Sequence, residues 1–213
     1  MTQTIEQLIA GGDFQIGAIQ DAKSRIAPVT RGGKPVLITL STTPELTTPF
    51  SPWPSFDGGE RCSLDLRVTP ELEKLSAWID EVVQRQVAAS PATWYSKVPK
   101  NLENLYNSCQ RPANKEGFSD TFRAKCSLRE KTASFKAWDL EKQVQLTVPQ
   151  LKHEVDWHSS AMAIQVQLSG VYFQAATGYG PVLSVKSVGL RTASAECPFE
   201  YIEARAWKLR TGA

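Results

Sequence analysis

The stretch from Ser160 to Thr192 constrains the fold more than any other part of the chain. Its first arm alternates apolar residues with small or polar ones, and its second arm repeats this pattern around residues 183–186. The apolar positions of the first arm are Met162, Ile164, Val166 and Leu168. A two-residue period is typical of a strand with one buried face. The stretch therefore predicts a long β-hairpin whose apolar face the rest of the chain must cover.

Glycines indicate where this hairpin turns and bends. Gly178 and Gly180 lie in the segment ATGYGP between the arms. Glycine readily adopts the positive φ that a tight connection needs. Gly170 and Gly189 interrupt the arms themselves, which predicts bulges or bends where a sheet curls.

The first two thirds of the chain predict further strands and a helix that covers them. Alternating patterns predict strands at 14–19, 36–40, 61–68, 121–128 and 134–140. Thr69 is a suitable N-cap and Pro70 a suitable first residue for a helix with an apolar stripe, which ends at Ser90. A second, shorter helical segment is expected at 102–109, whereas the polar segment 20–34 is interpreted as a flexible connection.

This order of elements predicts a mainly β fold with helices, of the α+β class. We expect an OB-fold-like antiparallel β-barrel with a helix pair between the third and fourth strands and a long C-terminal hairpin, because such barrels place a helix there. The expected organisation is a tail at 1–13, one nucleic-acid-binding domain at 14–192 and an arm at 193–213.

Composition narrows the class of partner. The net charge is only +2 over 213 residues, so an anionic partner would have to meet a local basic patch. No apolar run approaches the length of a membrane span, and the N-terminus shows no secretory signal. We therefore expect no membrane partner and an intracellular, reducing location: the cytoplasm, the nucleus or a viral replication site.

Catalytic and metal-binding signatures are missing from the sequence. The four cysteines are widely spaced and only two histidines accompany them, which argues against a zinc site. There is no nucleophile elbow, no phosphate-binding loop and no cluster of histidines and carboxylates. We expect no catalytic residue, no metal and no cofactor, and hence a protein that is not an enzyme.

Basic residues recur on the polar faces of the predicted strands. Arg61 and Arg67 share the polar face of one strand, Arg123 and Lys125 that of another, and Lys186 lies on that of the hairpin. Each would contact phosphates in a cationic groove, or would be a solvated surface charge. A polar connection carries four more basic residues that would either follow phosphates or keep a loop soluble: Lys23, Arg25, Arg31 and Lys34.

Aromatic residues supply the second requirement of single-strand binding, a flat face on which a base can stack. Lys136 and Trp138 share one strand face, and Trp53 lies on a proline-rich loop. Trp157 and His158 precede the hairpin, and Tyr172 and Phe173 lie near its tip with Tyr179. For each aromatic residue, packing in the core is the alternative.

The chain also resembles a known family through a series of short motifs in order. These are RGGKPVLITL, TPFSPW, CSLDLRV, WYSK, LENLY, TFRAKCSL, FKAWD and IQVQLSGVYFQAATGYGPVLSVKSVGL. The series looks like the single-stranded-DNA-binding proteins of nucleocytoplasmic large DNA viruses and, more distantly, is similar to OB-fold single-stranded-DNA-binding proteins of tailed phages. The resemblance covers about residues 14–192. It implies a non-enzymatic protein that coats unwound DNA in replication, recombination or repair.

Two functions remain in competition at this point. The first is sequence-tolerant binding of single-stranded DNA, or of RNA, through a basic groove and base stacking. The alternative is a protein-interaction module on the same barrel that forms a homodimer through the hairpin tip and the C-terminal arm. The sequence does not identify replication or recombination proteins as partners.

Overall fold

The computed structural model describes residues 5–19, 23, 25–40, 46–49, 52, 61–113, 115–127, 132–174 and 178–191. Within these residues, a ten-stranded sheet is accompanied by three α-helices and two short 3-10 helices. The strands are β1 (Gln15–Ile16), β2 (Ile26–Arg31), β3 (Lys34–Leu40), β4 (Arg61–Arg67), β5 (Gln110–Arg111), β6 (Thr121–Ser127), β7 (Lys136–Asp139), β8 (Val144–Gln145), β9 (Ala161–Gln174) and β10 (Gly178–Arg191). The helices are α1 (Ile5–Ala10), α2 (Pro70–Ala89), η1 (Pro91–Thr93), η2 (Leu102–Leu105) and α3 (Val148–His153).

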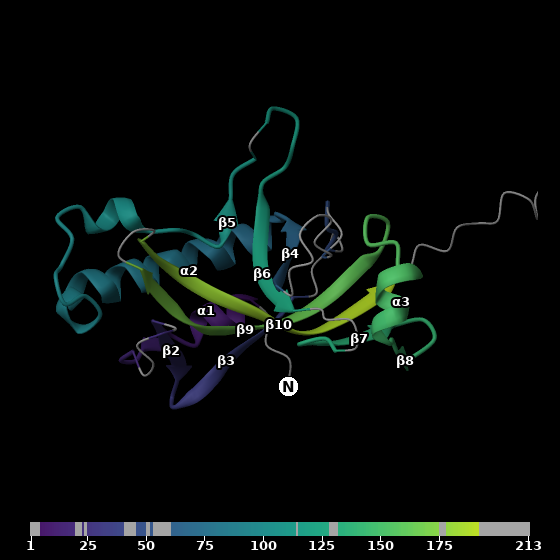
Figure 1. Cartoon of the computed structure of the whole chain (residues 1–213), viewed down its shortest axis with the longest axis horizontal. Helices are drawn as coiled ribbons and strands as arrows, with labels where there is room; N and C mark the ends of the chain where they lie inside the picture. Colours follow the sequence, from purple (N-terminus) through teal and green to yellow (C-terminus); the bar gives the residue numbers. More distant parts are fainter. Residues whose placement is uncertain are drawn as a thin grey trace, which may run out of the picture.

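The predicted hairpin is confirmed as β9 and β10, which pair antiparallel along their whole length. It runs along most of the long axis of the molecule, with α2 near one end and β7, β8 and α3 at the other (Figure 1). The apolar positions of its first arm are all buried. Because both arms have a buried face, the other elements are arranged around this hairpin.

The hairpin bends at two irregularities in its pairing. Val182 pairs with Gly170 and the next residue, Leu183, pairs with Leu168, which leaves Ser169 as an extra residue on β9. A second shift leaves Lys186 as an extra residue on β10. The bend expected at Gly170 is therefore present, whereas Gly189 pairs in regular register with Ala163.

Helix α2 covers the buried side of the sheet, as the sequence predicts. The Thr69 hydroxyl accepts a hydrogen bond from the Leu72 amide at 3.3 Å, and Pro70 opens the helix. The residues of its apolar stripe are buried, among them Leu72, Leu75, Ile79, Val82, Val83 and Val87. Among the described helices, none is both long enough and apolar enough to cross a membrane.

The sheet curls until its two sides almost meet. Its order is β1-β2-β3-β9-β10-β6-β4, with β7 and β8 beside the far half of β10. Leu46 bridges Met162 of β9, and the next residue, Thr47, accepts a hydrogen bond from the Arg67 amide of β4 at 2.9 Å. A partly open barrel of this kind is the form of an OB-type fold. The predicted α+β class is confirmed, with α2 between β4 and β6. Most pairings are antiparallel, but β6 and β7 each run parallel to β10.

Three local predictions differ from the structure. The segment interpreted as a flexible connection contains β2, which turns through Gly32 and Gly33, both at positive φ, into β3. The second helical segment is only the 3-10 helix η2, and α3 lies in a region where no element was predicted. Glycine pairs are favoured at two-residue turns between strands, so the β2–β3 hairpin had a signal in the sequence.

A cluster of aromatic rings fixes the end of the hairpin beside η1 and η2. The Phe173 ring stacks on Trp94 at 5.3 Å and on Tyr179 at 5.9 Å, with nearly parallel planes. Tyr95 contacts Phe173 edge-on, and Tyr106 contacts Tyr179. Such pairs stabilise by roughly 0.5–1.5 kcal/mol beyond burial. The strand ends at Phe173 and Tyr179 are thus packed into the domain.

Replacing Gly178 with alanine should destabilise the protein more than replacing Gly117. Both have positive φ, +89° and +86°, so both changes carry the cost of a left-handed alanine, about 1–2 kcal/mol. A β-carbon at Gly178 would lie 1.9 Å from the Leu105 carbonyl oxygen, whereas none of the described atoms lies within 4 Å of one at Gly117. In urea unfolding, the free energy of unfolding should fall by at least about 1 kcal/mol more for Gly178→Ala than for Gly117→Ala. Equal losses would contradict the close packing of η2 on β10.

Candidate nucleic-acid interface

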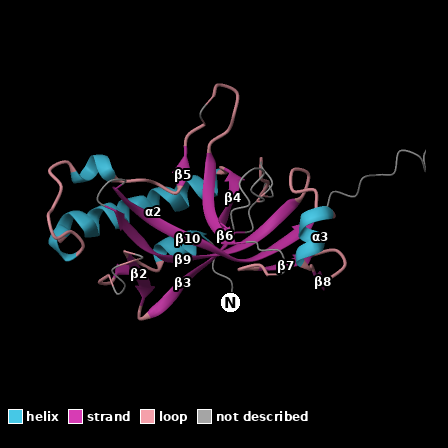
Figure 2. Ribbon diagram, in the orientation of Figure 1, coloured by secondary structure: helices cyan, strands magenta, loops and turns pink. Residues whose placement is uncertain are grey.

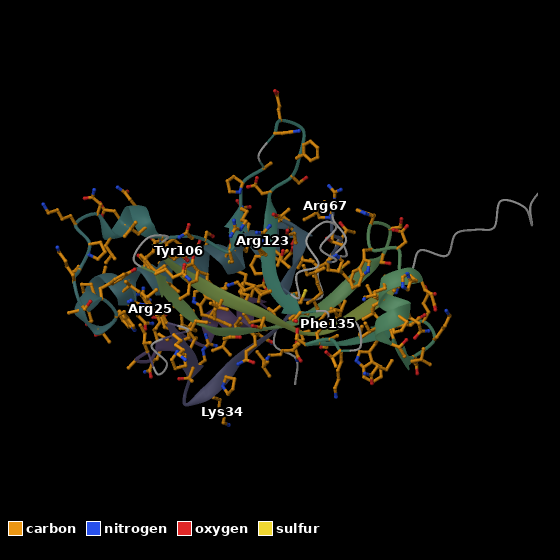
Figure 3. The ribbon with its side chains drawn as sticks, in the orientation of Figure 1. Arg25, Lys34, Arg67, Tyr106, Arg123 and Phe135 are labelled. Atoms are coloured by element: carbon orange, nitrogen blue, oxygen red, sulfur yellow. The ribbon has the colours of Figure 1, made fainter. Side chains whose placement is uncertain are left out.

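A groove of about 440 Å³ lies where β6, β9 and β10 pass beside the segment that joins η2 to β5. Strand residues of the sheet and loop residues of this segment both contribute to it. The described residues that line the groove are Lys23, Ile26, Asn107, Ser108, Cys109, Arg111, Arg123, Lys125, Tyr172, Gln174, Pro181 and Leu183. Figure 3 shows Arg123 on β6, between Tyr106 and Arg67, at the foot of the β5–β6 connection.

The groove is positively charged. Its lining includes four cationic side chains, and none of the described residues that line it is acidic. The cations are Lys23, Arg111, Arg123 and Lys125. Since the whole chain carries a net charge of only +2, positive charge is concentrated here. A concave surface focuses such a field toward an anionic ligand.

Arg123 shares its charge with a carboxylate of the neighbouring strand. Its guanidinium donates two hydrogen bonds to Asp65 of β4, from Nε at 2.7 Å and from Nη2 at 2.8 Å. These hydrogen bonds raise the pKa of Arg123, and Asp65 is buried. A bidentate pair fixes the orientation of the guanidinium. Arg123 therefore has a structural role at the groove, and the sequence-based prediction of a simple phosphate contact was incomplete.

Lys125 and Tyr172 form the centre of the groove. The Lys125 ammonium lies 5.7 Å from the centroid of the Tyr172 ring, within the range of a cation–π contact. The Tyr172 hydroxyl is hydrogen-bonded by the Asn107 side chain, and burial raises the pKa of Tyr172 while Arg111 opposes that rise. The phenol therefore stays neutral at physiological pH. A positive charge, a ring face and an amide meet in one place.

Buried contacts to α2 hold the segment that carries Asn107 and Arg111. The hydroxyls of Tyr106 and Ser108 both donate to Asp80, the latter at 2.6 Å, and burial raises the pKa of Asp80. Ser76 donates to the side chain of Gln110 at 2.8 Å. Because these groups are satisfied within the protein, the groove is preformed at this side.

The groove shows no sign of a catalytic nucleophile or, among the described residues, of a metal site. Burial raises the pKa of Cys109 to about 12, so the thiol is not a reactive thiolate at neutral pH. In the part of the chain that the structure describes, no three His, Cys, Asp or Glu side chains are placed to hold a metal ion.

Three predicted residues continue from the groove along the outer face of β10. Ser184 pairs with Lys125, Ser187 with Lys136 and Gly189 with Trp138, and paired residues share one face of a sheet. Lys186, the extra residue of the second bulge, is exposed between them. Lys136 and Trp138 are exposed as well, Trp138 by 39%. We call Lys125, Lys186, Lys136 and Trp138 the β10 track.

Two predicted stacking residues belong to the core instead. Phe173 is completely buried between Trp94 and Tyr179. Trp157 is only 3% exposed, and its indole N–H donates to the Leu151 carbonyl of α3 at 3.0 Å. Neither ring has a face available to a base, so these predictions were wrong. His158 is exposed in the turn before β9, at the opposite end of the hairpin from Tyr172.

Except for Lys23, the other predicted residues whose side chains the structure describes lie apart from the groove lining. Arg67 is exposed at the end of β4. The side chain of Arg61 and all of Trp53 lie outside the described residues. Of the polar connection, Lys23 lines the groove, Arg25 donates to the Trp94 carbonyl, and Arg31 lies over the Trp78 ring. Lys34 is exposed at the β2–β3 turn (Figure 3).

Sequence reasoning missed Arg111 and Asn107. Arg111 lies in a two-residue strand that pairs with β6, in a segment for which the sequence analysis predicts no strand. Asn107 lies four positions before Arg111. It reaches the groove because η2 packs on β10, and its backbone N–H donates to the Tyr179 carbonyl at 2.8 Å. Only the pairing of β5 with β6 brings Arg111 beside Arg123, and no local pattern signals it.

The comparisons with known proteins give remote structural likeness only. No protein-family model and no curated protein matches the chain. The single-stranded DNA-binding protein of bacteriophage Enc34 in complex with ssDNA is 11% identical, with a TM-score of 0.43, over 84% of this chain and 97% of that one. Gp2.5, a single-stranded DNA binding protein of bacteriophage T7, is 14% identical, with a TM-score of 0.45, over 76% and 88%. The resemblance to the single-stranded-DNA-binding proteins of large DNA viruses stays a prediction.

Removing Arg123 should destabilise the fold through Asp65. We expect Arg123→Ala to lower the free energy of unfolding by about 1–3 kcal/mol, less than for a fully buried pair because Arg123 is 37% exposed. The free energy of unfolding of the double variant Asp65→Ala/Arg123→Ala should fall by less than the sum of the decreases in the two single variants. Urea unfolding of all four proteins measures this coupling. Additive losses would show that the pair does not couple the two strands.

Proposed function

We propose that this protein binds single-stranded DNA without sequence preference, through phosphate contacts in the groove and base stacking beside them. The observation that carries the proposal is the groove itself, whose lining combines four cationic side chains with the ring of Tyr172, over which the Lys125 ammonium lies. Single-strand binding combines a cationic path for the backbone with aromatic faces for the bases. The protein would thereby coat and protect unwound DNA in replication, recombination or repair.

An unpaired strand fits this groove better than a duplex does. In a duplex the bases stack on one another, so a protein ring beside the phosphates has no base face to meet. An unpaired strand offers both phosphates and free base faces. The cations of the groove other than Arg123, together with the lysines of the β10 track, then bind successive phosphates, while Tyr172 and Trp138 offer rings to bases.

The structure weakens the main basis of the alternative function. An interaction module that forms homodimers through the hairpin tip would need exposed aromatic residues there. Of the three aromatic residues predicted near that tip, Phe173 and Tyr179 are buried against η1 and η2, and Tyr172 is half-buried in the groove. The C-terminal arm at 193–213, the second surface invoked for that function, lies outside the described residues.

The proposal is tested by titrating labelled oligo-dT, oligo-U and a duplex of equal length at several salt concentrations. Each phosphate contact on a single strand changes the slope of log K against log salt by about −0.7. The three groove cations other than Arg123 therefore give a slope of about −2, and the two further lysines of the β10 track bring it to about −3.5 when the ligand reaches them. We expect oligo-dT to bind more tightly than the duplex. Equal affinity for the duplex, or binding insensitive to salt, would reject the proposal. The oligo-U titration decides between DNA and RNA.

Lys125→Ala should weaken oligo-dT binding and reduce the magnitude of the salt slope by about 0.7, because one phosphate contact is lost. Arg111→Ala should do the same, since it removes a second cation of the groove lining. Lys34→Ala is the matched control, because Lys34 is an exposed lysine outside this lining. If Lys34→Ala has the larger effect, the binding surface has been misplaced.

Trp138→Ala should lower affinity for oligo-dT that is long enough to reach β7, by about 1–3 kcal/mol. The salt slope should not change, because stacking releases no counterions. Trp138→Phe retains a ring and should keep most of the affinity. Thermal melting should be little changed, since the indole is 39% exposed. A large drop in melting temperature would instead identify Trp138 as a packing residue.

A further inference from the structure

The connection between β5 and β6 projects from the sheet (Figures 1 and 2). Phe118 in this connection is 64% exposed, more than any other large hydrophobic side chain in the described ranges. A single exposed apolar residue is common on protein surfaces. Phe118 differs from such a residue because hydrogen bonds fix the base of its connection and because that base adjoins the groove.

Hydrogen bonds hold the base of this projection. The Asp120 carboxylate accepts from the Ala113 amide at 2.9 Å and from the Gln110 side chain at 3.3 Å. The Asp120 carbonyl accepts from the Val68 amide of the chain that follows β4, at 3.1 Å. Both sides of the projection are thereby tied to each other and to the sheet. Phe118 is presented on a supported hairpin, not on a loop that lies against the domain.

A turn at the end of the projection places Phe118 beside a lysine. The Phe118 amide donates to the Lys115 carbonyl at 3.3 Å, and Gly117 between them has φ of +86°. Lys115 is exposed, as is Phe118. Lys115 and Phe118 thus begin and end one exposed turn, with Glu116 and Gly117 between them.

The projection rises from the edge of the groove. Arg111 pairs with Thr121 at its base, and Arg123 follows two positions further along β6. Both arginines line the groove. Thr121 follows Phe118 by three positions, a span of at most about 10 Å. A strand that leaves the groove past Arg111 therefore passes within reach of the Phe118 ring.

We propose that Phe118 stacks on a base of the bound strand just outside the groove, and so extends the binding site by one nucleotide on the Arg111 side. The inference rests on the proposed single-strand binding. Stacking on an aromatic side chain is independent of base identity, because every base has a flat face. An exposed Phe118 thus adds affinity without adding sequence preference, and Lys115 offers a contact to the adjoining phosphate.

The test is a series of oligo-dT ligands of increasing length, titrated against the full chain and its variants. Phe118→Ala should weaken binding of the longer ligands by about 5- to 100-fold, the range for one stacked base. It should leave the salt slope unchanged and should not affect ligands that only fill the groove. Phe118→Trp should restore long-ligand affinity. Leu37→Ala, which truncates a 50% exposed side chain of β3, is the matched control.

Unchanged affinity of Phe118→Ala at every length would overturn the inference. A change in oligomeric state of Phe118→Ala in sedimentation, without a change in affinity per site, would also overturn it, because the ring would then serve a second copy of the chain. Lys125→Ala in the same titrations separates the two proposals. If Lys125→Ala weakens binding and Phe118→Ala does not, the proposed stacking on Phe118 is wrong and the proposed binding in the groove stands. If neither variant weakens binding, the proposal that the groove binds single-stranded DNA is wrong.

Discussion

The antiparallel pairing of β9 with β10 is the constraint on which the rest of the structure depends. These two strands are each fourteen residues long and have one apolar face. Burying that face requires α2 and the curling of the sheet, which β2 and β3 extend beyond β9 and β6 and β4 extend beyond β10. The opposite face of the hairpin is left largely polar. The groove and the β10 track lie on this second face. The position of the candidate binding surface is thus a consequence of how the core is closed.

The residues that fix the structure of the groove differ from the residues that would bind a ligand. Asp80 and Ser76 of α2 fix the segment from Tyr106 to Gln110, and Asp65 fixes Arg123. Lys125, Arg111 and Tyr172 are then presented on supports that need no rearrangement to bind. A preformed site avoids part of the ordering cost of association. The arginine most deeply integrated into the fold is therefore a poor choice for a test of binding, and Lys125 is a better one.

The sequence predicted the elements that have a local period and failed where the fold depends on distant partners. The hairpin, β4 and α2 follow from alternation, a helix cap and an apolar stripe within single segments. The face of Phe173 could not be predicted, because the bulge at Ser169 shifts the alternation between Leu168 and Tyr172. The ion pair of Arg123 required the register that places Asp65 opposite it, and Arg111 required the pairing of β5 with β6. Register between segments far apart in the chain has no local signature.

The most direct test of the central claim is photo-crosslinking of oligo-dT to the full chain, followed by mapping of the modified peptides. The account predicts crosslinks on the groove face, at Tyr172 and in the segment that carries Arg111, with weaker labelling near Trp138. Excess unlabelled single strand should suppress them, and excess duplex should not. Crosslinks confined to the β2–β3 turn around Lys34, or labelling that duplex suppresses equally well, would contradict the account.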